Sequence, residues 1–180
     1  MCSSNDAANL ESRMIALNIA QAVVGCDFGV VMGSGMTGLM GQIKGVLAEN
    51  NVFLEVVGIE GEDELEAGFG DVKFPVDSSF ARIEQLYRES DAILFLPGGV
   101  GTLSEFYAML DCKLETGDQK PLILYNEDHS FDMVIKDMRE RCTKRGFVDH
   151  QAFLDFEVVN NQKELEKVFE KYQDTKERVR

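Results

Sequence analysis

The residues most able to do chemistry lie in the stretch 96–105, which reads LPGGVGTLSE. Glycine lets the backbone approach a ligand closely, and the first amides of a helix attract an anion. A phosphate could therefore bind here without a lysine, beside a carboxylate, Glu105, that could act as an acid or base. The expected phosphate-binding residues of this turn are Gly98, Gly99, Val100, Gly101 and Thr102.

A helix is predicted directly after this turn, because apolar residues recur at helical spacing. They are Leu103, Phe106, Tyr107, Leu110 and Leu114. Thr102 is the expected N-cap. Glu105 then has the spacing of a capping box, in which its carboxylate would accept from the amide of the cap residue. The alternative is that Glu105 lies off the apolar face and points to the mouth of the turn, where it could take part in catalysis.

A second glycine-rich stretch, 33–41, reads GSGMTGLMG and follows another apolar run, FGVVM. Its expected nucleotide-binding residues are Gly33, Ser34 and Gly35. The stretch 96–105 has neither the Gly-Lys-Ser/Thr ending of a Walker A loop nor the GxGxxG spacing of a dinucleotide fingerprint. The chemistry of these turns therefore has to be inferred from the elements that position them.

Those elements alternate between strand and helix. Strands are predicted at 28–32, 52–59, 72–76, 91–96, 121–125 and 153–159, and helices follow most of them. The helix near the N-terminus is expected to bury Leu10, Met14, Leu17, Gln21 and Val24, and the helix after Ser78 or Ser79 to bury Phe80, Ile83, Leu86 and Tyr87. The acidic segment 61–71, GEDELEAGFGD, is expected to be a solvated excursion or a lid.

Apolar strands that alternate with helices indicate the α/β class, here a Rossmann-like, doubly wound parallel sheet with helices on both faces. The length of 180 residues suits a single nucleotide-binding domain, 1–180. Because ligands bind beyond the carboxyl ends of parallel strands, both glycine-rich turns should lie at one edge of the sheet and share one site.

The net charge of −14 argues against nucleic-acid partners and against docking on anionic membranes. No apolar run is long enough for a membrane span, and no signal peptide is evident, so a cytoplasmic protein is expected. The scattered cysteines and the lack of a His or Cys cluster favour free thiols and no zinc site.

The stretch 97–105, PGGVGTLSE, fits the PGGxGTxxE motif of the LONELY GUY family, whose bacterial members are often labelled lysine decarboxylase-like. The stretch 33–41 is similar to the family's GGGxxGLMG, with Ser34 in place of the middle glycine. The family's arginine, fifteen residues before the motif proline, corresponds to Arg82. Its usual Met-His-x-Arg-Lys surroundings are replaced by SFARI, and Arg82 could also be an ordinary exposed helix arginine.

The resemblance implies an enzyme, a nucleotide N-glycosidase. Such a phosphoribohydrolase cleaves a nucleoside 5′-monophosphate, AMP or a cytokinin riboside monophosphate, to the free base and ribose 5-phosphate. Arg82 and Glu105 look like the family's catalytic pair. No metal or other cofactor is implied, and pyridoxal phosphate is not expected because neither turn contains a lysine. A small-molecule nucleotide is the expected partner, and a homodimer the expected assembly.

Two alternatives stay open. A non-catalytic nucleotide-binding or molybdenum-cofactor carrier protein would share the fold and the glycine motif, and a regulatory homo-oligomer would use the apolar helices as an interface. The family also begins with a strand that ends in a Cys-Gly-Ser-Ser-like loop, whereas here Met1 directly precedes Cys2. We therefore expect the natural chain to start upstream of Met1, with a further strand in the middle of the sheet.

Overall fold

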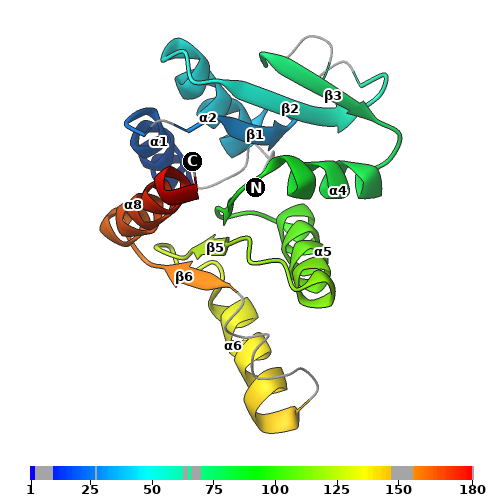
Figure 1. The fold of residues 1–180 in the computed structure, drawn as a ribbon, viewed down its shortest axis with the longest axis vertical. Coiled ribbons are helices and arrows are strands. Elements are labelled where there is room, and N and C mark those ends of the chain that lie inside the picture. The colour runs from blue at the N-terminus through cyan, green and yellow to red at the C-terminus, as the bar shows by residue number, and fades with distance from the viewer. Residues whose placement is uncertain (3–9, 27, 63–64, 66–69, 147–155, 180) are drawn as a thin grey trace.

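The computed structural model describes the chain except for residues 3–9, 27, 63–64, 66–69, 147–155 and 180. Strands and helices alternate along it, which confirms the α/β class (Figure 1). The order is α1 (Leu10–Val24), β1 (Val30–Gly33), α2 (Gly38–Glu49), β2 (Leu54–Ile59), β3 (Val72–Val76), α4 (Ser79–Glu89), β4 (Ile93–Phe95), α5 (Val100–Thr116), β5 (Leu122–Tyr125), α6 (Asp132–Glu140), the π-helical turn η1 (Arg141–Arg145), β6 (Glu157–Val159) and α8 (Gln162–Val179).

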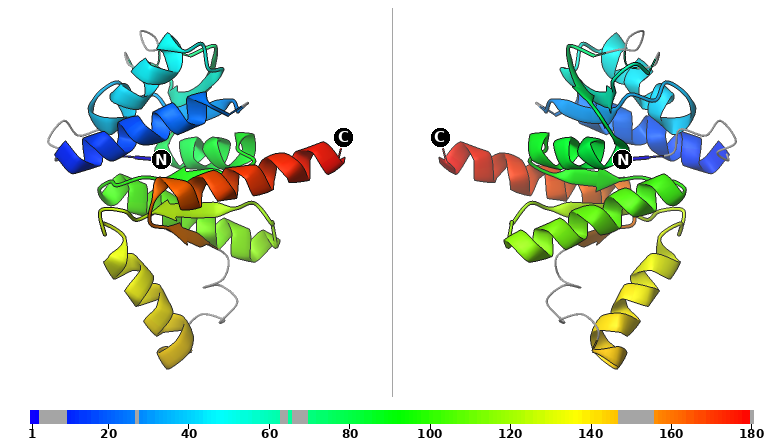
Figure 2. Two further views of the ribbon diagram at one scale, coloured as in Figure 1. Left: turned by 90° about the vertical axis from the view of Figure 1, so that its left-hand side faces the viewer. Right: turned by 90° about the vertical axis from the view of Figure 1, so that its right-hand side faces the viewer.

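The described strands form two three-stranded sheets, in the orders β1-β2-β3 and β4-β5-β6. Every strand pair is parallel, as predicted; Val30 lies opposite Leu54 in the first sheet and Ile93 opposite Leu122 in the second. Helices α1 and α8 lie on one side of the strands, and α4 and α5 lie on the other (Figures 1 and 2). The carboxyl ends of β1 and β4 therefore lead into the two glycine-rich turns.

Met1 lies beside β4, in the region between the two sheets (Figure 1). Its ammonium group donates a hydrogen bond to the Leu94 carbonyl at 2.7 Å. The Leu96 amide donates to the Met1 carbonyl at 2.8 Å. This alternation is the pattern of a parallel strand pair, so Met1 extends the pairing of the second sheet by one residue.

The core fixes the rotation of α5, the helix that carries Glu105. Phe106 is fully buried. Its ring makes edge contacts with the rings of Phe95 and Phe156, each with centroids 5.4 Å apart. Burial of this large side chain leaves little freedom for α5 to turn about its axis, so the position of Glu105 is determined by its neighbour.

Two predicted helix faces are wrong. In α1, Leu10 is 76% exposed and Met14 is also exposed, whereas the buried hydrophobic residues are Ile15, Ala16, Ile19 and Ala20. The helix has apolar residues on two faces, and spacing does not show which of them meets the core. In α4, Leu86 and Tyr87 are buried as predicted, but Phe80 is 85% exposed because it lies in the first turn, beyond the edge of the core.

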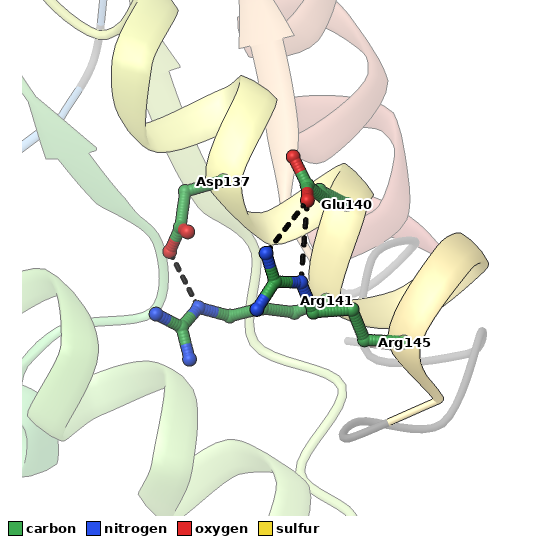
Figure 3. Close-up of polar contacts among 4 residues, drawn as sticks. All are labelled: Asp137, Glu140, Arg141 and Arg145. Atoms are coloured by element: carbon green, nitrogen blue, oxygen red, sulfur yellow. Dashed lines mark hydrogen bonds and ion pairs between the residues drawn. The ribbon is translucent and has the colours of Figure 1, made fainter.

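Helix α6 projects away from the two sheets (Figures 1 and 2). Ion pairs line its outer end (Figure 3): Arg141 Nε lies 2.5 Å from Asp137 Oδ2, and Arg145 lies 3.1 Å from Glu140 Oε1. These pairs are exposed to solvent, so they contribute little to the stability of the fold. The segment ends at Gly146, which has φ +63° and caps η1. Among the described residues no helix is both long and apolar enough to span a membrane.

Candidate nucleotide site

The glycine turn after β4 opens directly into α5, but the helix begins earlier than predicted. Gly99 is the N-cap, with an extended backbone of φ −89° and ψ −154°, and its carbonyl accepts the Leu103 amide at 3.2 Å. Thr102 is therefore not the cap, and the capping box of Thr102 and Glu105 is wrong. The physical reason is that glycine itself can occupy an N-cap, so α5 starts at Val100 and places both residues inside the helix.

This correction matters for ligand binding. A capping box would have covered the first amides of α5, but no side-chain cap bond is made there by any residue in the described ranges. Gly99, Val100 and Gly101 are exposed, with Val100 at 82%. A Cβ built on Gly99 or Gly101 would meet nothing within 4 Å. The open amides and the helix dipole thus form a site that suits an anion.

Gly98 packs closely against the side chain of Thr102. Thr102 is buried, and a Cβ on Gly98 would lie 2.0 Å from its Oγ1 and 2.7 Å from its Cβ. Only glycine fits at position 98 without moving the threonine. The Thr102 side chain therefore supports the turn, and its backbone amide is the part that belongs to the open end of α5.

Glu105 and Arg82 lie on different helices. Glu105 lies in the second turn of α5 and Arg82 in the first turn of α4, and both are half-buried. Burial raises the pKa of Glu105, while the N-terminal ammonium group and Arg82 act to lower it. Within the described part of the chain neither side chain makes an ion pair, so both remain available to a ligand.

Cys2 connects the two glycine-rich elements. Its thiol is buried, and burial raises its pKa; Glu105 adds to that increase, whereas the N-terminal ammonium group and Lys44 oppose it. Glu105 on α5 and Lys44 on α2 therefore both influence the pKa of one thiol. Lys44 is fully buried, a feature that we did not predict, although its place between Met40 and Leu47 on the apolar stripe of α2 was a signal.

The turn after β1 differs from the turn after β4. Gly33 ends β1 and is buried, Gly35 is half-buried, and Ser34 is only 2% exposed. The Ser34 hydroxyl donates to Glu62 Oε2 at 3.2 Å, so the side chain at the middle of this turn already contacts a carboxylate.

Glu62 belongs to the acidic segment 61–71, which we expected to be a solvated excursion or a lid. Much of that segment lies outside the described residues. Of the described residues in this segment, Leu65 is buried in the core, and Glu62 contacts Ser34 in the glycine-rich turn after β1. Sequence reasoning did not single out Glu62, because nothing distinguishes it from the neighbouring carboxylates of the segment.

Two surface hollows lie away from these residues. One, of about 510 Å³, lies between α6 and β6 and is lined by Ile135, Arg139 and Val158 among others. The other, of about 640 Å³, lies between α5 and α6 and includes Tyr107 and Arg141. None of the predicted site residues lines either hollow, so the candidate site remains the open end of α5 with Glu105 and Arg82.

Solved structures share the fold. The molybdenum cofactor carrier protein of Chlamydomonas reinhardtii superposes with a TM-score of 0.62 at 16% identity, over 88% of this chain and 85% of that one. The molybdenum cofactor binding protein of Rippkaea orientalis superposes with a TM-score of 0.66 at 16% identity, over 93% and 91% of the two chains. At this identity the likeness establishes the Rossmann-like architecture alone.

Curated relatives are more similar in sequence. The probable cytokinin riboside 5′-monophosphate phosphoribohydrolase LOGL5 of Oryza sativa is 29% identical over 154 residues, which cover 84% of this chain and 62% of that protein. LOG3 of Arabidopsis thaliana, a cytokinin riboside 5′-monophosphate phosphoribohydrolase, is 25% identical over 183 residues, or 99% of this chain and 83% of LOG3. The chain thus spans less than two thirds of the length of LOGL5.

A family model described as "Possible lysine decarboxylase" matches residues 37–169, a range that contains Arg82, the turn 97–101 and Glu105. The match covers most of the chain and agrees with the relatives and with the motif at the start of α5. The chain belongs to this possible lysine decarboxylase family, the LONELY GUY family.

Proposed function

We propose that this protein hydrolyses the N-glycosidic bond of a nucleoside 5′-monophosphate, of the AMP or cytokinin riboside monophosphate type. The products are the free base and ribose 5-phosphate. The observation that carries the proposal is Glu105, a half-buried carboxyl group whose pKa Arg82 acts to lower and which lies one turn from the uncapped amides of α5. The names of the curated relatives support the same reaction.

In this mechanism the 5′-phosphate binds at the open amides of Gly99, Val100 and Gly101. Water adds to C1′ of the ribose as the bond to the base nitrogen breaks, and the base leaves with a proton. The transition state resembles an oxocarbenium ion, which the carboxylate of Glu105 stabilises or to which it directs the water. Arg82 orients the phosphate or the ribose through a forked contact that lysine cannot make.

The raised pKa of Glu105 suits the role of a base, because a carboxyl group whose pKa lies closer to neutrality accepts a proton more readily. Arg82 opposes the effect of burial and so keeps the carboxylate ionised over a wider range of pH. The two residues therefore act as a pair: burial gives Glu105 its basicity, and Arg82 limits the loss of its charge.

A second candidate function is binding or carriage of a nucleotide or of molybdenum cofactor without catalysis. The observation that favours it is the segment Ser79–Ile83, in which the Met, His and Lys that usually surround the family's arginine are missing. A chain that kept the open end of α5 but lost part of the catalytic surroundings would still bind a phosphate-bearing ligand.

The test is incubation of the purified protein with AMP and the other nucleoside monophosphates, with free base measured by chromatography. We expect release from at least one of them. Glu105→Gln should lower the rate at least about 100-fold, since it removes a group that acts in the transition state. Glu115→Gln is the matched control, because Glu115 is an exposed carboxylate on the same helix.

Arg82→Ala, with the exposed Arg88→Ala as its control, should lower the rate as well. Equal release by the Glu105→Gln and unmodified proteins would contradict the assigned role of Glu105. No release from any nucleotide, together with a higher melting temperature in the presence of AMP, would favour the binding protein.

A further inference from the structure

Glu62 is held in place at the carboxyl end of the first sheet. It follows β2, and β2 is the parallel neighbour of β1, the strand that leads into the turn 33–35. One oxygen of its carboxylate, Oε2, accepts hydrogen bonds from the Ser34 hydroxyl at 3.2 Å and from the Ile59 amide at 3.3 Å. Two donors from different strand ends thus fix one carboxylate oxygen.

The hydrogen bond between Ser34 and Glu62 depends on close packing between β2 and the turn after β1. A Cβ on Gly58, in β2, would lie 2.7 Å from the Ser34 Cβ and 2.9 Å from its Oγ. The strand and the turn therefore approach as near as backbone and serine allow, and this approach brings the hydroxyl within reach of Glu62. The other carboxylate oxygen, Oε1, accepts no hydrogen bond from a described residue, and Glu62 is half-buried.

A fixed carboxylate with one unoccupied oxygen excludes a phosphate by charge and accepts hydrogen bonds from hydroxyl groups. In Rossmann-type sites, an acidic residue after the second strand commonly binds a ribose hydroxyl. We infer that Glu62 is a specificity-determining residue that accepts a hydrogen bond from the ribose 2′-hydroxyl of the nucleotide. Ser34 is the positioning residue that holds it. The inference rests on the proposed function.

This assignment divides the work between the two glycine-rich turns. The turn after β4 has open amides and binds the phosphate. The turn after β1 holds the Glu62 carboxylate through Ser34, and this carboxylate binds the sugar.

The test compares AMP with 2′-deoxyadenosine 5′-monophosphate by isothermal titration calorimetry. All proteins carry Glu105→Gln, so that the nucleotide is not consumed. We expect AMP to bind about tenfold more tightly than the deoxynucleotide, as a hydrogen bond to a charged group gives. Glu62→Gln should remove most of that preference by weakening AMP alone. Glu60→Gln should keep the preference, because Glu60 directly follows β2 but is exposed and has no described side-chain contact.

Should Glu62→Gln fail to fold, as judged by circular dichroism, Ser34→Ala serves instead and should reduce the preference by several-fold. An unchanged preference, or tighter binding of AMP by Glu62→Gln, would overturn the inference and leave the hydrolase proposal standing. Loss of the preference in a protein that releases no base with Glu105 intact would overturn the hydrolase proposal alone. Failure of AMP to bind at all would overturn both.

Discussion

At the scale of single residues, Glu105 connects stability with pH. Burial raises its pKa above the ordinary value of 4.5, so the folded protein binds this proton more tightly than the unfolded chain does. The free energy of unfolding should therefore fall as the pH rises from 4.5 through the raised value, and level off above it. In Glu105→Gln this fall should be absent, which makes the variant more stable than the unmodified protein at pH 7 but not at pH 4.

Urea unfolding at the two pH values measures the effect. Glu115→Gln, on the exposed face of α5, should show the same pH dependence as the unmodified protein. A Glu105→Gln variant that is less stable at pH 7 would mean that the carboxylate contributes to the fold more than its burial costs.

Arg82 and Glu105 were predicted as a pair because two motifs at fixed distances in the sequence specify them; in the structure Arg82 acts to lower the pKa of Glu105, and their joint role stays a prediction. The role of Thr102 was predicted wrongly, since spacing alone cannot distinguish a capping box from two residues one turn further into a helix. The contact of Glu62 could not be predicted from the sequence for a different reason. Its contact with Ser34 joins residues 28 positions apart, and only the pairing of β1 with β2 brings them together.

At the scale of elements, the start of α5 depends on Gly98. In Gly98→Ala the new methyl group would overlap Thr102, which is buried and β-branched and so cannot easily turn away. We expect a loss of about 1–3 kcal/mol in the free energy of unfolding, the usual cost of overpacking. Gly101 lies three residues further along the chain, and a Cβ built on it would meet nothing within 4 Å. Gly101→Ala should therefore be neutral or stabilising.

Chemical denaturation of the two glycine variants at one pH gives the comparison. Equal stability of Gly98→Ala and Gly101→Ala would show that Thr102 moves aside without cost, and that the turn is less constrained than its geometry indicates.

The positions of helices and strands were predicted better than their buried faces. Strand β5 is a short apolar run between polar residues, and it is buried throughout, as expected. Helix α1 carries one apolar stripe through Leu10 and Met14 and another through Ile15 and Ile19. The second stripe meets the core, because α1 packs against α2 and α8. That packing is a tertiary choice, which periodicity within the helix does not contain.

At the scale of the whole molecule, the net charge of −14 should repel a nucleotide anion as it approaches. The Debye length, beyond which salt screens this repulsion, is about 30 Å at 0.01 M and about 10 Å at 0.1 M ionic strength. We therefore expect the KM for AMP to fall about two- to fivefold between these conditions. Inhibition by uncharged adenosine should not change. A KM that rises with salt would mean that Arg82 and the open amides outweigh the charge of the surface.

The sequence predicted the parallel arrangement, because alternation of apolar strands with helices permits few topologies. It did not predict the division into two three-stranded sheets with Met1 beside β4. It also did not predict that α6 would project from the body, since that placement depends on how the helix between β5 and β6 packs against the rest of the molecule.

The close approach of Gly58 to Ser34 has an evolutionary consequence. A side chain at position 58 would collide with the serine, whereas the Leu65 Cδ1, at 3.0 Å, is the end of a flexible chain that can shift. Substitutions at the two positions should therefore be epistatic: an alanine at 58 becomes acceptable only after Ser34 has been replaced by glycine, the residue that the family usually has there. In a lineage that keeps the serine, position 58 is constrained by its neighbour rather than by its own backbone, and the two sites should change together.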